Sequence, residues 1–219
     1  MPAKKKTTKP GKDTIVNKYM EFVLEEGHMP TSVYTFTKAI KIAESDFYQH
    51  FGSLKSIQKA VWNAFFENTL QLLQKNEDYL GYANREKMLS FFYTFFELLA
   101  LNRSYVLFAL SEQSNMLKNL DQLKGLRKNI LEFAAELIEE GNAEKQMRIT
   151  QHNPKVFSEG AWLQTLFLIK FWIEDDSAGF EKTDLAIEKS VNTIFDVFDN
   201  TPLESIIDFG KFLFKENFA

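Results

Sequence analysis

The chain has 219 residues, of which 45% are hydrophobic and 26% charged, and its net charge is −4. This composition excludes a wholly disordered chain and supplies enough apolar side chains for a substantial core. The absence of Cys excludes disulfides and thiolate metal sites, and it suits a reducing cytoplasm. The longest apolar run, residues 161–173, is shorter than the roughly 20 residues of a membrane helix. We therefore expect a cytoplasmic protein without membrane insertion.

Positive charge is concentrated at the N-terminus. Residues 1–55 hold nine Lys and six acidic residues, whereas residues 56–219 hold 17 basic and 24 acidic ones. The excess comes from five Lys within residues 1–12, since residues 13–55 hold four Lys and six acids. A short basic tail is typical of an arm that contacts nucleic acid, and equally of a solubilising N-terminus.

Apolar residues recur with a helical period along nearly the whole chain, and no alternating run is long enough to predict a strand. We therefore predict an all-α protein of about ten helices. Capping residues and terminating glycines set the expected helix ends. Four helices are expected in the first third of the chain: from Asp13 or Thr14 to Gly27, from Thr31 or Ser32 past Phe36, over 44–50, and from Ser53 to Gln74 with Leu72 facing inward. Three more are expected over 84–101, 104–112 and 121–140, the last closed by Gly141-Asn142. The final three are expected from Asn153 to Asp176, from Thr183 to Phe198, and over 203–218.

Residues 31–57 carry the strongest functional pattern. A short helix, a tight turn and a second short helix have the spacing of a helix-turn-helix, whose second helix enters the major groove of DNA. This second helix ends in Tyr48-Gln49-His50-Phe51, followed by Gly52-Ser53 and a long helix. The segment resembles the DNA-binding domain of the TetR family of bacterial transcriptional regulators, by motif over about residues 14–60 and by architecture elsewhere.

The resemblance implies a domain order and a set of DNA contacts. A flexible basic tail (1–12) would precede a three-helix DNA-binding domain (13–58), joined by the long helix to an effector-binding and dimerisation domain (59–219). Thr31, Ser32 and Tyr48 would contact phosphates, and Ser45 and Gln49 would face base edges. The candidate DNA-binding residues are Thr31, Ser32, Lys41, Glu44, Ser45, Tyr48, Gln49, His50 and Lys55.

Three features depart from the family pattern. Glu44 and Asp46 place carboxylates where phosphates would repel them. Leu54 stands where a Lys is usual, with Lys55 one position later, and Ile40-Lys41 stands where a Gly is common. These departures keep an alternative open, in which a protein of this fold has lost DNA binding and carries an apolar ligand or lipid. The amphipathic segment 203–218 also fits that alternative.

The resemblance further implies an effector cavity and a homodimer. Aromatic residues of helical spacing are candidates for the cavity: Phe92, Phe95, Phe96, Phe108, Phe133, Trp162 and Phe167. Because these positions carry no charge, we expect an apolar small-molecule effector. Two late helices, 153–176 and 183–198, would form a four-helix interface with a second copy, although a monomer that buries them in its own core is the alternative. The interface candidates are Leu163, Phe171, Ile187, Val191, Ile194 and Phe198.

No pattern of catalytic residues is present. The sequence has no Gly-rich phosphate loop, no recognisable nucleophile setting and no His pair at metal-ligand spacing. The acidic pairs Glu139-Glu140 and Asp175-Asp176 are expected to be solvated helix ends. We therefore predict no enzyme and no cofactor or metal, but a ligand-responsive regulator, by resemblance a repressor, that binds a palindromic operator in double-stranded DNA as a homodimer.

Overall fold

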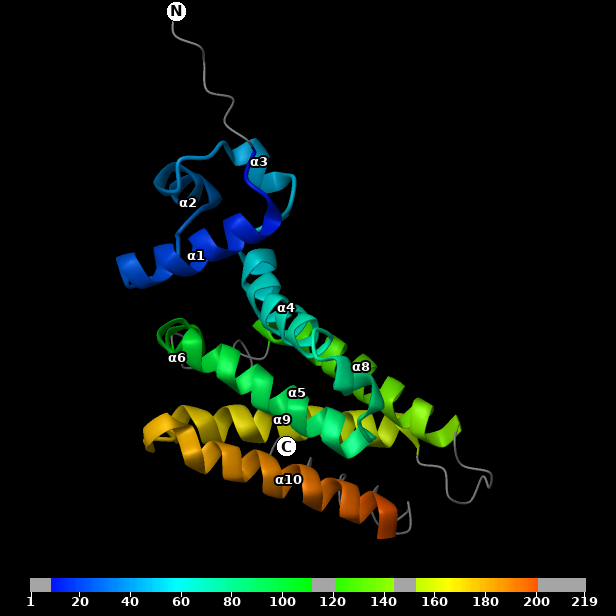
Figure 1. Ribbon diagram of the computed structural model, residues 1–219. Helices are drawn as coiled ribbons and strands as arrows, with labels where there is room; N and C mark the ends of the chain where they lie inside the picture. Colours follow the sequence, from blue (N-terminus) through cyan, green and yellow to red (C-terminus); the bar gives the residue numbers. More distant parts are fainter. Residues whose placement is uncertain (1–8, 112–120, 144–152, 201–219) are drawn as a thin grey trace, which may run out of the picture. The chain divides into compact units, whose positions relative to one another are not determined.

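The computed structural model describes residues 9–111, 121–143 and 153–200, which form helices connected by short loops (Figure 1). These residues hold nine α-helices and two short 3-10 helices, without a strand. The predicted all-α fold is thereby confirmed. The chain divides into two compact units, the first comprising Met1–Phe65 with Leu101–Gly125, and the second comprising Phe66–Ala100 with Leu126–Ala219. The division differs from the boundary expected at residue 58, because residues 101–125 belong to the first unit.

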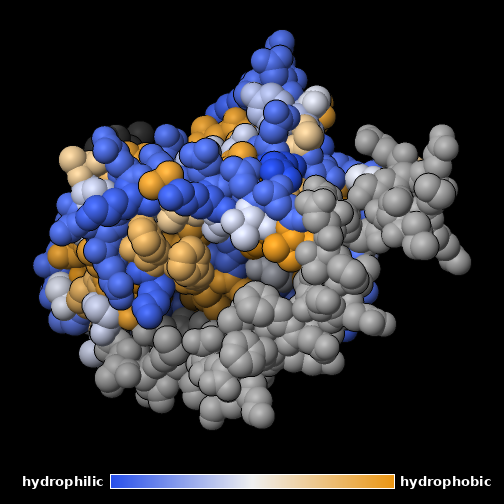
Figure 2. Space-filling model, turned by 90° about the horizontal axis from the view of Figure 1, so that it is seen from below, coloured by the Kyte–Doolittle hydropathy of each residue, from blue (hydrophilic) through white to orange (hydrophobic). Residues whose placement is uncertain are grey.

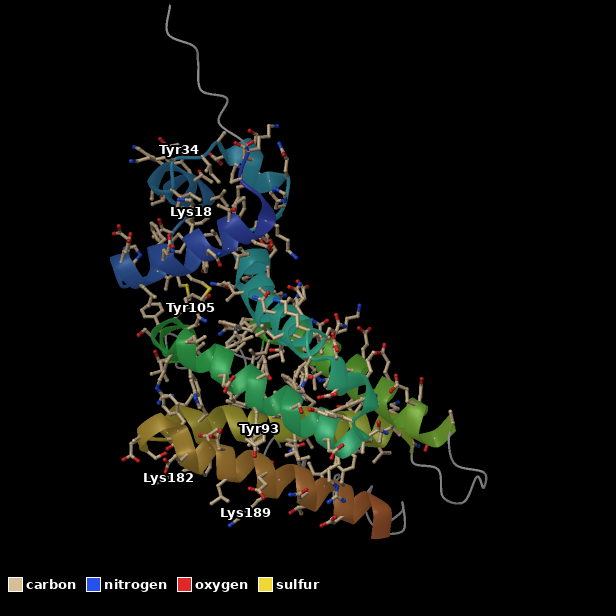
Figure 3. All side chains as sticks on the ribbon, viewed as in Figure 1. Lys18, Tyr34, Tyr93, Tyr105, Lys182 and Lys189 are labelled. Atoms are coloured by element: carbon tan, nitrogen blue, oxygen red, sulfur yellow. The ribbon has the colours of Figure 1, made fainter. Side chains whose placement is uncertain are left out.

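The first unit holds the predicted three-helix segment. Its elements are α1 (Lys12–Glu26), α2 (Val33–Ala39), α3 (Glu44–Tyr48), the first part of α4 (Leu54–Leu73) and α6 (Arg103–Ser111). Helix α1 packs against α2 and α6, and α2 packs against α3. Tyr105 of α6 points toward α1 (Figure 3), where its ring meets Tyr19 edge-on at a centroid distance of 6.5 Å.

A buried hydrogen-bond chain joins α4 to α6 within this unit. The Nε1 group of Trp62 donates to Oε1 of Gln122 at 3.0 Å, and Nε2 of Gln122 donates to the carbonyl of Ala109 at 2.9 Å. Both polar groups of the Gln122 amide are thus satisfied away from water, which makes the arrangement specific as well as stabilising.

Local signals predicted several helix ends correctly. Gly27 ends α1 at φ 67°, a left-handed conformation that favours Gly. Ser32 caps α2 by accepting from the N–H of Thr35 at 3.0 Å. Ser53 and Ser56 cap α4 reciprocally, each backbone N–H donating to the other hydroxyl at 3.0 and 3.2 Å. The predicted cap of α1 was wrong, because α1 begins after Gly11 with no side-chain cap.

The second unit is built from longer helices. It contains the rest of α4, η1 (Glu77–Gly81), α5 (Asn84–Leu101), α8 (Lys124–Ala143), α9 (Pro154–Glu174), η3 (Ala178–Phe180) and α10 (Glu181–Asn200). Rings from three helices form its core, with Phe91 of α5 against Phe133 at 4.8 Å and against Phe66 at 5.5 Å. Helices α9 and α10 pack side by side. Among the described residues, no helix is long and apolar enough to cross a membrane.

Two predicted features of this unit were wrong. Gly141 does not close α8, which continues to Ala143. A Cβ at Gly141 would collide with the amide of Asn84, whose Nδ2 donates to the carbonyl of Leu137 at 2.6 Å. The glycine is therefore a point of close helix approach rather than a terminator. Leu72, expected to face inward, is exposed. The predicted helix 203–218 lies outside the described residues.

Asp175 was also misjudged as a solvated residue. It is buried between α9 and α10, and its carboxylate accepts from the N–H and hydroxyl of Ser177 (2.9 and 2.6 Å) and of Thr183 (2.9 and 2.6 Å). Thr183 lies in the first turn of α10, which begins two residues earlier than predicted, at Glu181. Burial of the carboxyl opposes ionisation, but these four hydrogen bonds outweigh it and hold the pKa of Asp175 well below its usual range.

We expect Asp175→Asn to destabilise the protein by about 1–3 kcal/mol at pH 7, because two charge-assisted cap interactions are weakened. A depressed native pKa contributes stability that is present above the unfolded pKa of about 4 and is lost as pH falls below it. The gap between wild type and variant should therefore narrow between pH 7 and pH 3 in urea denaturation. Asp176→Asn is the matched control, since the exposed ion pair of Asp176 with Lys182 contributes little. An equal loss in both variants would contradict the assignment.

Candidate nucleic-acid interface

The orientation of α3 is set by two buried phenylalanines. Phe47 is 0% exposed and Phe51 is 4% exposed. The Phe47 ring meets Phe36 of α2 edge-on at 6.0 Å and lies 5.5 Å from the Phe51 ring. Phe36 in turn contacts Tyr19 and Phe22 of α1. The apolar side of α3 is therefore buried against α2, which in turn packs against α1.

The opposite side of α3 is polar and exposed. Ser45, Tyr48, Gln49 and His50 are all exposed. The Tyr48 ring packs edge-on against Phe47 at 5.5 Å while the side chain remains 53% exposed. A polar face of this kind, backed by a sealed core, has the form of a helix that enters a DNA groove.

The two carboxylates of α3 do not occupy the centre of this face. Glu44 and Asp46 are half-buried, and at about 100° per residue they lie on opposite flanks of the direction in which Ser45 points. Both are in the first turn of α3, where a negative charge interacts favourably with the helix dipole. The two negative charges therefore lie beside the outward side chains of Ser45 and Gln49, not between them.

Exposed cations surround α3 instead of lying on it. Lys41, in the turn before α3, and Lys55, in the first turn of α4, are exposed, whereas Leu54 is half-buried. Lys41 adopts φ 58°, the left-handed conformation that a Gly would adopt more easily. The turn therefore keeps the geometry of a Gly turn while it carries a positive side chain.

Helix α2 adds two residues that the sequence reasoning missed, Tyr34 and Lys38. Tyr34 is 59% exposed on α2 (Figure 3). Nζ of Lys38 lies 5.7 Å from the centre of the Tyr34 ring. The exposed hydroxyls of Thr31 and Ser32 are at the start of the same helix. The signal available in the sequence was the i, i+4 spacing of an aromatic residue and a Lys on the polar side of α2.

In the second unit the predicted pocket residues divide into groups. Phe92, Phe95, Phe96, Phe133 and Trp162 are buried within it. Phe108 is half-buried and belongs to the first unit. Phe167 is 52% exposed, so its side chain lies on the outer surface of α9 and does not line the interior of the unit.

The predicted interface residues differ in exposure. Ile187 and Val191 are 0% exposed, because they face α9 of the same chain and leave no surface for a partner. Leu163, Phe171 and Ile194 are half-buried, and the side chain of Phe198 lies outside the part that the structure describes. Hydrophobic atoms are nevertheless exposed among hydrophilic ones on the face seen from below, where α10 lies (Figure 2).

Burial raises the pKa of two tyrosines of this unit. Tyr93 of α5 lies toward α10 (Figure 3), and burial together with the nearby Glu188 and Asp184 raises its pKa. Burial and the charge of Glu140 raise the pKa of Tyr79 to about 12. Neither tyrosine is therefore prepared to act as a base, and the described residues include no cluster of three or more His, Asp or Glu that could hold a metal ion.

The sequence of residues 87–213, more than half of the chain, matches the family model of the tetracyclin repressor-like C-terminal domain. The chain belongs to the TetR family. No curated protein matches the sequence.

Solved structures show the TetR fold over nearly the whole chain. A protein assigned to the TetR-family transcriptional regulators, from Syntrophomonas wolfei, superposes with a TM-score of 0.64 at 16% identity, covering 88% of this chain and 96% of its own. The fatty acid degradation regulator FadR from Bacillus halodurans gives 0.54 at 14% identity, covering 90% and 99%. A TetR-family regulator from Shewanella sp. PV-4 gives 0.52 at 15%, covering 86% and 96%.

We expect Phe47→Ala to destabilise the first unit by about 3–5 kcal/mol, since it removes a fully buried ring. Tyr48→Ala, one residue away on the exposed side, should cost only about 0.5 kcal/mol. Urea denaturation of both variants, followed by circular dichroism, checks the difference. Comparable losses in the two variants would show that the rotation of α3 described above is wrong.

Proposed function

We propose that this TetR-family chain is a ligand-responsive transcriptional regulator, acting as a repressor, that binds operator DNA as a homodimer. The observation that carries the proposal is the exposed polar face of α3, opposite a fully buried Phe47. A helix of five residues has no other evident use for such an arrangement, because its packing is already complete on the inner side. The major groove admits a helix whose outward side chains reach base edges.

The surrounding groups suit contacts with the phosphate backbone. Thr31, Ser32 and Tyr34 offer exposed hydroxyls from α2, and Lys38, Lys41 and Lys55 offer positive charge. These groups come from the elements directly before and after α3 in the chain. Phosphate contacts of this kind position a protein on DNA without reading its sequence.

Titration of the purified dimer onto fragments of its own promoter at two salt concentrations tests DNA binding. We expect sequence-specific binding that weakens as salt increases, because bound Lys side chains release counterions. Binding to no fragment, or binding without salt dependence, would contradict the proposal.

A single-residue variant sharpens that test. Lys55→Ala should lower affinity for operator and non-operator DNA alike and reduce the slope of log K against log salt by roughly 0.9, the value of one lost phosphate contact. Lys189→Ala, an exposed cation on α10, is the matched control and should leave the slope unchanged. If Lys55→Ala also leaves the slope unchanged, Leu54 has abolished this contact instead of displacing it to Lys55.

The proposed dimer uses the outer faces of α9 and α10. Leu163, Phe167 and Phe171 recur every four residues on α9, and the Phe167 and Phe171 rings are 6.1 Å apart. Helices α9 and α10 are joined by a hydrogen bond, in which the side-chain amide of Gln164 on α9 donates to the hydroxyl of Ser190 on α10 at 2.9 Å. Phe167, a predicted pocket residue, is 52% exposed and therefore belongs to the proposed interface. Two-fold symmetry would place the recognition helices about one DNA turn, roughly 34–36 Å, apart.

Phe167→Glu should raise the dissociation constant of the dimer by at least about 30-fold, the effect of losing a hot spot worth roughly 2 kcal/mol. Sedimentation equilibrium measures this change. Leu80→Glu is the control. It also places a charge at an exposed apolar residue, 81% exposed, but on η1 and not on α9 or α10. An unchanged dimer in Phe167→Glu would contradict the proposed interface.

We further propose an apolar effector bound in the second unit, whose binding changes the separation of the two recognition helices. The concentration of buried rings on α5 and their contacts with Phe66 and Phe133 support an apolar ligand. The name of the structurally similar fatty acid degradation regulator suggests a lipid-like class. Native mass spectrometry of freshly purified protein tests this, and a consistently empty protein would argue against it.

One observation favours a second function. Glu44 and Asp46 remain next to the outward face of α3, and their charge disfavours approach to phosphates. A TetR-fold protein that carries an apolar ligand and does not bind DNA would show the ligand in native mass spectrometry and no salt-sensitive DNA binding.

A further inference from the structure

The identity of the bases that α3 contacts can be inferred from the side chains that its packing turns outward. Phe47 and Phe51 point inward, four residues apart. At about 100° per residue, the side chain directly opposite this pair is that of Gln49, with Ser45 one turn earlier on the same side. Gln49 keeps helical dihedrals (φ −67°, ψ −26°), and its N–H donates to the carbonyl of Ser45 at 3.2 Å. The centre of the outward face is thus an amide and a hydroxyl.

The chemistry of this face differs from that of a guanine-reading helix. Guanine presents only acceptors in the major groove, and its usual partner is a bidentate Arg or Lys. Residues 44–50 contain neither Arg nor Lys. Adenine presents an acceptor at N7 and a donor at N6, which a Gln amide matches with two hydrogen bonds.

The flanking carboxylates act in the same direction. Glu44 and Asp46 can only accept hydrogen bonds when ionised. Next to guanine O6 and N7 they would face other acceptors, whereas adenine and cytosine each offer an amino group. The carboxylates that weaken contact with phosphates therefore also disfavour guanine as the base directly beside them, while the cytosine of a G·C pair can still donate to them.

We propose that Gln49 specifies an adenine in each half-site of the operator, through its amide to N6 and N7, and that the carboxylates of α3 disfavour guanine there. This inference rests on the proposed DNA-binding function. In this proposal, Gln49 determines which base is preferred at one position. The lysines around α3 supply affinity that does not depend on the base sequence.

The experiment begins with the full-length protein and selection of its preferred sites from random duplex DNA. Each adenine of the selected half-site is then replaced, one at a time, by 7-deazaadenine, which lacks the N7 acceptor but keeps the Watson–Crick pair. Fluorescence anisotropy should show one position per half-site at which wild-type binding weakens about 5- to 100-fold. Gln49→Ala should bind the natural and the deaza duplex equally at that position.

Two further variants complete the design. Gln71→Ala, which removes an exposed Gln from α4, is the matched control and should keep the wild-type sensitivity to deazaadenine. Gln49→Arg should shift the preference at that position from adenine to guanine, because Arg pairs bidentately with guanine. Both sites are exposed, so the variants are expected to fold, and circular dichroism verifies this.

The possible outcomes separate the inference from the function beneath it. Specific sites at which no deazaadenine weakens binding, or at which Gln49→Ala remains sensitive, overturn the assignment of Gln49 and leave the regulator intact. A guanine at the Gln49-dependent position overturns the inference in the same way. Failure to select any sequence overturns the DNA-binding proposal itself, and the inference with it.

Discussion

The packing of Phe47 against Phe36 and Phe51 is the contact on which the proposed DNA-binding face depends. A helix of five residues is far too short to be stable by itself, so its rotation is determined by the rings that it buries. Because Phe47 and Phe51 are one turn apart and both face inward, Ser45 and Gln49 must face outward. The edge-on contacts with Phe36 extend this constraint to α2, and through Tyr19 to α1.

If α3 binds DNA as proposed, this arrangement assigns affinity and specificity to different residues. The exposed cations, Lys38, Lys41 and Lys55, lie on α2, the turn before α3 and the start of α4. The outward side chains of α3 itself are neutral, and its carboxylates lie on the flanks. Contacts with phosphates hold a protein on any duplex, whereas contacts with base edges distinguish one duplex from another. With few cations near α3, the proposed DNA binding depends comparatively more on the second kind of contact.

Features that depend on neighbouring residues in the sequence could be predicted, and features that depend on distant ones could not. The end of α1 at Gly27 and the caps at Ser32 and Ser53 follow from local backbone requirements. From the sequence, Gly141 resembles a helix terminator. In the structure, the Asn84 amide, 57 residues earlier in the chain, occupies the space that a side chain at position 141 would need. Asp175 likewise looks solvated, because its partners are defined only once α9 and α10 pack together.

The same limit explains why Ile187 and Val191 of α10 were expected at an interface although they are fully buried within the chain. A stripe of Ile187, Val191 and Phe195 shows that one face is covered, but not by what. In the structure, α9 of the same chain covers that face of α10, and the Phe195 ring lies 5.2 Å from the Phe157 ring of α9. Helix α9 is apolar on more than one side, so covering one side with α10 leaves Phe167 exposed. An exposed ring on a helix already packed within its own chain is better placed to meet a second copy than any residue that the internal packing has buried.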